Sequence, residues 1–173
     1  MNATVNFILF QVGWFAGVLG AASRTEWLAT IGVAIVIAIH LLLTKTRLTE
    51  LLLVAAAGMM GFIVDSVLIS QGVFLPVNHW AILGPMPIWL LALWMLFATT
   101  LNHSLRWLAN RVVLQPAAGL LFAPLAYYAG YKMEALTITG SGSIYYNFII
   151  IGVCWMFVVP LLYWFANTIN QRN

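Results

Sequence analysis

The sequence carries very little charge. Lysine, arginine, aspartate and glutamate together make up 6% of its 173 residues, whereas hydrophobic residues make up 64% and the mean hydropathy is +1.00. Soluble domains carry roughly 25% charged residues. A chain with so little charge cannot cover a surface that faces water, so we expect an integral membrane protein whose solvent is the lipid bilayer.

Further absences narrow the chemistry. Cys154 is the single cysteine, so no intrachain disulfide can form. The seven lysine and arginine residues are scattered, and no basic run of the kind that binds nucleic acid is present. The sequence also lacks paired carboxylates, a nucleophile-elbow or phosphate-loop motif, and a Cys/His cluster with metal-ligand spacing. We therefore predict no catalytic residue and no metal site, and favour a non-enzymatic or accessory role.

What the chain does contain is a series of long, continuously apolar segments. There are six of them, separated by short joints that are mostly polar: Val5–Ala22, Trp27–Leu43, Leu51–Ser70, Pro85–Leu101, Val112–Tyr131 and Tyr145–Ala166. Each is close to the ~20 residues that cross ~30 Å of hydrocarbon as a helix. Continuous runs without alternation exclude a membrane barrel. The sequence predicts an all-α, six-transmembrane-helix bundle that forms a single domain over residues 1–173.

The positive charges predict the orientation of this bundle. One side of the membrane receives five basic residues, which are Lys45, Arg47, Arg106, Arg111 and Arg172. The other side receives only Arg24 and Lys132, each near an acid. Because positive residues accumulate on the cytoplasmic side, both termini are predicted to be cytoplasmic. Arg106 and Arg111 are candidates for binding lipid phosphate, with plain anchoring of the topology as the alternative.

Gly13 and Gly17 form a G-x-x-x-G pair in the first segment. Such pairs let two helix backbones approach closely in lipid. The pair predicts either packing within the bundle or a homo-oligomer through the Gly13/Gly17 face, and the pattern alone does not choose between them.

Asp65 is the one acid in the middle of an apolar run. Gly58, Gly61 and Asp65 follow i, i+3, i+7 spacing, so they share one face of a helix and the acid faces other helices rather than lipid. A charged aspartate at a helix centre costs ~3 kcal/mol on insertion scales. Two interpretations remain open: a site for a proton, a cation or a ligand headgroup, or a neutral aspartate hydrogen-bonded to a neighbouring Tyr, Trp or Asn.

The connection Gln71–Gly84 has no charge and is unusually apolar, so we expect it to lie along the outer interface or to dip back as a lid. A cavity beneath it is expected to be lined by the acid and five side chains of the same layer, which are Asp65, His79, Trp80, Trp89, Tyr127 and Asn147. From this expected cavity we predict that the protein binds or moves a lipid or an apolar small molecule. The alternatives are a membrane enzyme or redox subunit of lipid modification that needs a cofactor or partner, and a structural assembly partner.

His40 and His103 are both expected near the cytoplasmic edge, the latter on a fourth helix whose pattern continues through Asn102 to Trp107. Two facing histidines can ligate a b-type haem. Interfacial histidines without any cofactor are the simpler interpretation, so we expect no cofactor and keep haem through His40 and His103 as the alternative.

The chain resembles a bacterial inner-membrane family in four stretches. They are NFILFQVGWFAGVLGA near the N-terminus, GFIVDSVLISQG around the lone acid, PIWLLALW, and FATTLNHSLRWL over Phe97–Leu108. The family is catalogued as domain of unknown function 2878, and the resemblance covers nearly the whole chain. Its members occur among bacterial genes linked to membrane fatty-acid modification and photo-oxidative stress. The resemblance therefore implies an inner-membrane location and a lipid-related role, and it assigns no catalytic residue.

Overall fold

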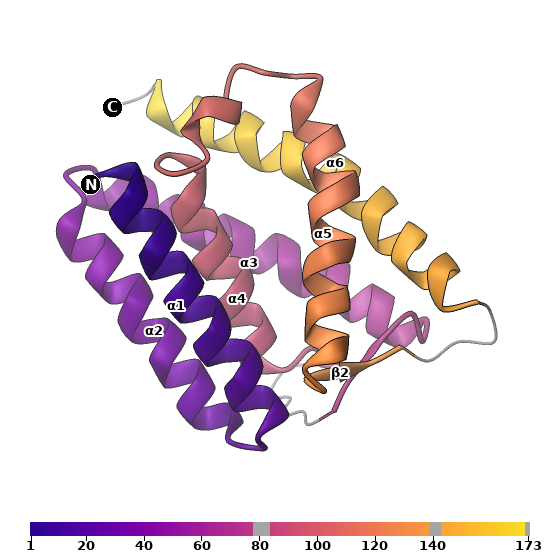
Figure 1. Ribbon diagram of the computed structural model, residues 1–173. Helices are drawn as coiled ribbons and strands as arrows, with labels where there is room; N and C mark the ends of the chain where they lie inside the picture. Colours follow the sequence, from indigo (N-terminus) through magenta and orange to yellow (C-terminus); the bar gives the residue numbers. More distant parts are fainter. Residues whose placement is uncertain (78–83, 139–142, 172–173) are drawn as a thin grey trace.

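The computed structural model describes residues 1–77, 84–138 and 143–171. Within these residues the chain forms six α-helices, which are α1 (Ala3–Ala22), α2 (Glu26–Leu43), α3 (Arg47–Ser70), α4 (Ile88–Leu101), α5 (Leu114–Lys132) and α6 (Ile144–Asn170). Figure 1 shows their arrangement. Each predicted apolar segment coincides with one of these helices, so the prediction of an all-helical fold is confirmed.

Four of the helices described, α1, α2, α3 and α6, are long and apolar enough to cross a membrane. Their outward side chains are large and apolar: Met59, Phe157 and Trp164 are 68%, 62% and 66% exposed. So much exposed apolar surface is characteristic of a protein surrounded by lipid. α4 is also apolar but has only 14 residues. The membrane class is thus supported, whereas the count of six spans and the cytoplasmic termini stay predictions.

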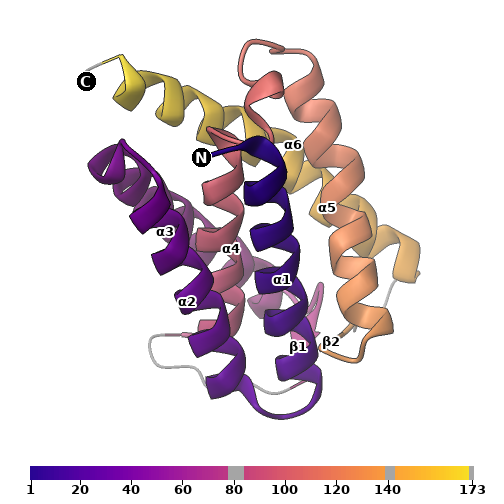
Figure 2. The same ribbon diagram turned by 60° about the vertical axis from the view of Figure 1, so that its left-hand side comes forward.

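α4 is the central helix of the bundle. Nine of its 14 residues are buried, and it packs against α1, α2 and α3. Figures 1 and 2 show it enclosed by these three helices, while α5 and α6 pack on each other to one side. A helix that is hydrophobic all round is a buried helix. The aromatic-rich fourth segment therefore supplies the core around which the others are arranged.

The glycine face of α1 packs against another helix of the same chain. A Cβ built on Gly13 would lie 2.8 Å from a methyl carbon of Leu96, and one on Gly17 would lie 2.7 Å from a methyl carbon of Leu93. Both leucines belong to α4, so the glycines let α1 approach the central helix closely. Of the two uses predicted for the glycine pair, the structure therefore has packing within the bundle. A homo-oligomer through the Gly13/Gly17 face would have to displace α4.

The prediction that the fourth helix continues to Trp107 is wrong. α4 ends at Leu101, turns follow, and a short 3-10 helix η1 covers Arg106–Leu108. The physical reason is competition for backbone groups by side chains. Asn6 Nδ2 donates to the Thr99 carbonyl at 2.9 Å, and the His103 amide donates to Thr100 instead. The Ser104 amide then donates to Asn6 Oδ1 at 3.1 Å and not to a carbonyl one turn back, so the helix does not continue.

A two-residue β pairing ties the opposite end of the bundle together. β1 (Leu75–Pro76) pairs antiparallel with β2 (Leu136–Thr137), and it joins the α3–α4 connection to the α5–α6 connection. Just before β1, the fully buried Phe74 packs edge-on against Tyr127 of α5, with ring centroids 5.1 Å apart. The described start of the Gln71–Gly84 connection therefore covers the layer that contains Asp65 and Tyr127.

Candidate functional sites

Asp65 is fully buried and both of its carboxyl oxygens accept hydrogen bonds. Trp94 Nε1 donates to Oδ2 and the Tyr127 hydroxyl donates to Oδ1, each at 2.7 Å. The three residues come from α4, α5 and α3, so the carboxyl group joins three helices. The hydrogen-bond partners are a Trp and a Tyr, as the second interpretation expects, whereas whether Asp65 is neutral stays a prediction.

Aromatic rings fill the space around Asp65. The Trp94 ring lies directly on Gly61, where any Cβ would overlap it, and it stacks on Trp155 with centroids 4.3 Å apart. Gly61 is the glycine that the sequence places on the same face as Asp65. Its absent side chain is what lets the indole reach the carboxylate across the α3–α4 contact.

Only part of the predicted Asp65 set comes together as expected. Tyr127 binds the carboxylate, whereas Trp89 and Asn147 are buried but donate no hydrogen bond to it. His79 and Trp80 lie outside the described residues. The sequence reasoning missed Trp94, although the indole N–H of a buried tryptophan needs a partner and an intramembrane carboxylate is a natural one.

A second polar site lies at the other end of the bundle, around Glu50 in the first turn of α3. Glu50 and His40 are each only 1% exposed, and His40 Nε2 lies 3.1 Å from Glu50 Oε2. His103 Nε2 lies 3.3 Å from Oε1, and Asn102 Nδ2 donates to the same oxygen at 3.1 Å. One carboxylate is thus surrounded by two imidazoles and an amide.

Further side chains lock this group in place. We call the whole set the Glu50 cluster; it comprises Asn6, His40, Glu50, Asn102, His103 and Ser104. Asn6 of α1 donates to the Thr99 carbonyl at 2.9 Å and accepts from the Ser104 hydroxyl at 2.7 Å. Asn170 of α6 donates to Asn102 Oδ1 at 3.0 Å. The cluster therefore joins the ends of α1, α2, α3 and α6 to the turn after α4.

The haem alternative does not fit this geometry. The His40 and His103 rings are in edge-to-face contact, with centroids 5.0 Å apart and planes at 81°, and Glu50 bridges them. A haem plane between two axial imidazoles would need the rings on opposite sides of a gap. Two rings in contact leave no such gap.

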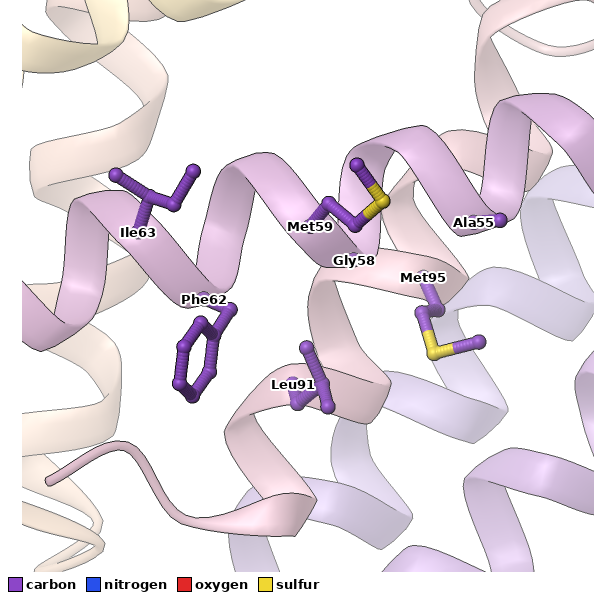
Figure 3. A pocket seen from close by; sticks show the side chains of 7 residues that line it. All are labelled: Ala55, Gly58, Met59, Phe62, Ile63, Leu91 and Met95. Carbon is purple, nitrogen blue, oxygen red and sulfur yellow. The ribbon is translucent and has the colours of Figure 1, made fainter. Parts of the chain in front are cut away.

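An apolar groove runs along the outer face of the α3–α4 contact (Figure 3). Its volume is about 380 Å³, and its lining residues are Ala55, Gly58, Met59, Phe62, Ile63, Leu91 and Met95. Asp65 is not among them. Gly58 lies at the α3–α4 contact, where an added Cβ would come within 3.0 Å of Met95 Cγ. The groove shares no lining residue with the cavity predicted beside Asp65, so it is a different site and that cavity stays a prediction.

Arg106 and Arg111 are both exposed beyond the end of α4. The Arg111 guanidinium lies 5.4 Å from the centroid of the exposed Trp107 ring, and the adjacent Val112 is 73% exposed. A basic pair beside exposed aromatic and aliphatic side chains suits the level of lipid headgroups.

Comparison with known proteins identifies the family. The family model described as a protein of unknown function, DUF2878, matches residues 3–161, and the chain belongs to this family. No curated protein and no solved structure matches the chain.

Proposed function

We propose that this member of the DUF2878 family is a multi-pass protein of the bacterial inner membrane that holds a lipid acyl chain or an apolar small molecule in the α3–α4 groove. The observation that carries the proposal is the groove itself. Its volume of about 380 Å³ lies within the range of about 300–1,000 Å³ typical of small-molecule sites. Every residue that lines it is apolar, so its occupant is apolar too.

The chemistry of the lining supports a flexible occupant. Met59 and Met95 lie on opposite helices across the groove, and methionine side chains adapt to irregular shapes. Phe62 provides one flat wall, and Gly58 adds no side chain that would fill the space. The groove opens on the outer surface of the bundle, where a chain from the bilayer can enter sideways.

Asp65 has a positioning role in this proposal. Its bond to Trp94 crosses from α3 to α4, the two helices that form the walls of the groove. By fixing the distance between these helices, the bond keeps the groove open. The bundle is oriented with Lys45, Arg47, Arg106 and Arg111 toward the cytoplasm, which places Asp65 in the outer half of the membrane.

Lipid retention tests the proposal. The full chain is purified in mild detergent and bound lipid is measured by native mass spectrometry for the wild type and for Gly58→Leu and Ala55→Leu, which fill the groove. Ala34→Leu, at an exposed position on α2, is the matched control. We expect a retained lipid or apolar adduct in the wild type and the control and its loss in both groove variants.

Equal retention in all four proteins would reject the groove as the binding site. A wild type that carries no adduct and always co-purifies with another chain would replace the proposal with the assembly-partner interpretation. A membrane enzyme that needs a cofactor is the second candidate, and the Glu50 cluster is the observation that favours it.

A further inference from the structure

We propose that the Glu50 cluster binds a divalent transition-metal ion through His40, Glu50 and His103. The three potential ligand atoms lie within 4.8 Å of one another. They come from the last turn of α2, the first turn of α3 and the turn after α4, so the fold brings them together from separate segments. Binding at this cluster does not depend on the apolar groove.

The distances suit coordination. Two ligands about 2.1 Å from a tetrahedral metal lie about 3.4 Å apart. The two separations between imidazole nitrogen and carboxylate oxygen are 3.1 Å and 3.3 Å, so small movements outward accommodate an ion between them. Two histidines and one carboxylate are the donor set of catalytic zinc sites and of non-haem iron sites, and both types leave positions open for water or substrate.

His103 provides an independent observation. Its Nε2 atom is buried, and its 3.3 Å contact with Glu50 Oε1 does not have the geometry of a good hydrogen bond. Leaving a buried polar atom unpaired is unfavourable, and native structures rarely do so. A metal ion between His103 and Glu50 would give this nitrogen a partner.

Metal binding through His40 requires a change in which ring nitrogen carries the hydrogen. The orientation of Asn6 is set by the Ser104 amide, which donates to it, and by the Thr99 carbonyl, which accepts from it. The NH₂ group of Asn6 is therefore the one that faces His40 Nδ1, and it acts as the donor in this long contact of 3.4 Å. In a neutral His40 this arrangement places the ring hydrogen on Nε2, directed at Glu50. Metal binding shifts this hydrogen to Nδ1, and the long contact with Asn6 opens.

The surroundings of Glu50 already resemble those of a metal ligand. Asn102 donates to Glu50 Oε1 and is itself held by Asn170, so the carboxylate is oriented by a second layer of hydrogen bonds. His103 is 11% exposed, compared with 1% for the other two ligands. The exposed side of His103 is therefore the route by which an ion reaches the cluster.

Cobalt and zinc binding test this proposal on the full chain in detergent after treatment with a chelator. We expect the wild type to bind one Co²⁺ per chain with visible d–d absorption, and Zn²⁺ to displace it. His103→Gln and Glu50→Gln should lower the affinity at least tenfold. Asn110→Ala, at an exposed position outside the cluster, should bind like the wild type.

Two further measurements separate coordination from a purely structural hydrogen-bond network. Zn²⁺ should raise the thermal midpoint of the wild type, because an ion that binds the folded state stabilises it, and should leave that of His103→Gln unchanged. X-ray absorption of the zinc-loaded wild type should show two imidazole ligands, a readout that needs no variant to fold. Absence of Co²⁺ and Zn²⁺ binding by the wild type, or unchanged binding by a folded His103→Gln, would overturn the proposal.

Discussion

Trp94 donates its indole N–H to Asp65 Oδ2 at 2.7 Å and so joins the central helix α4 to α3. An indole can only donate, so this oxygen must accept. The hydroxyl of Tyr127, which binds the other oxygen, can donate or accept. The side chain at position 65 must therefore offer an acceptor to Trp94, whereas it can offer either an acceptor or a donor to Tyr127.

This difference predicts how substitutions at Asp65 behave. Asp65→Asn should stay folded with nearly wild-type stability, because its amide oxygen can accept from Trp94 while its NH₂ group donates to the Tyr127 hydroxyl. Asp65→Leu should be strongly destabilised, since it leaves two buried donors unpaired at about 1–3 kcal/mol each. Thermal or denaturant unfolding in the same detergent measures both variants. Equal destabilisation of Asp65→Asn and Asp65→Leu would show that the carboxylate charge, not the hydrogen-bond pattern, matters.

Two glycines one turn apart on α3 should respond differently to alanine. A Cβ at position 61 would overlap the Trp94 ring, so Gly61→Ala should lose about 1–3 kcal/mol of stability through overpacking. Gly58→Ala meets the flexible Met95 side chain at 3.0 Å, and alanine favours a helix over glycine by about 1 kcal/mol, so it should be nearly neutral. Comparison of the two unfolding midpoints checks this pair. A neutral Gly61→Ala would mean that the indole does not pack on that helix face.

The cytoplasmic location of both termini can be tested with single cysteines. In a Cys154→Ser background, Lys132→Cys should react with a membrane-impermeant maleimide in intact bacterial cells. Lys45→Cys, at the opposite end of the bundle, should react only after the inner membrane is permeabilised. The opposite pattern would reverse the orientation, and with it the placement of Asp65 in the outer half of the membrane.

Hydropathy predicts the helices well because a helix surrounded by lipid is apolar along its whole length. It places the helical segments within a few residues, but it starts the third helix at Leu51, whereas α3 begins at Arg47. The polar residues of the first turn lower the local hydropathy, so hydropathy does not assign Glu50 to the helix. Hydropathy ends the fourth helix correctly at Leu101, whereas the helical pattern extends it to Trp107, since a periodic pattern does not reveal that Asn6 captures the Ser104 amide.

The contacts of the two polar sites could not be predicted from periodicity. The sequence placed Asp65 on the packing face correctly and named Tyr127 among its neighbours. It did not identify Trp94 as a partner, because that contact depends on how α3 and α4 are rotated about their axes. The sequence pairs His40 with His103 at one edge of the bundle, and the structure brings the two rings together. That Glu50 lies between them depends on a tertiary arrangement of three segments, which periodicity does not reveal.

Photoaffinity labelling tests most directly the central claim, that the α3–α4 groove holds an apolar ligand. A fatty acid with a diazirine in its chain is added to the purified protein in vesicles, irradiated, and the labelled peptides are mapped by mass spectrometry. We predict saturable labelling of residues 55–63 and 91–95 that excess unlabelled fatty acid competes away and Ala55→Leu reduces. Labelling spread evenly over the lipid-facing surfaces of α1, α2 and α6, without competition, would contradict the claim that the α3–α4 groove holds an apolar ligand.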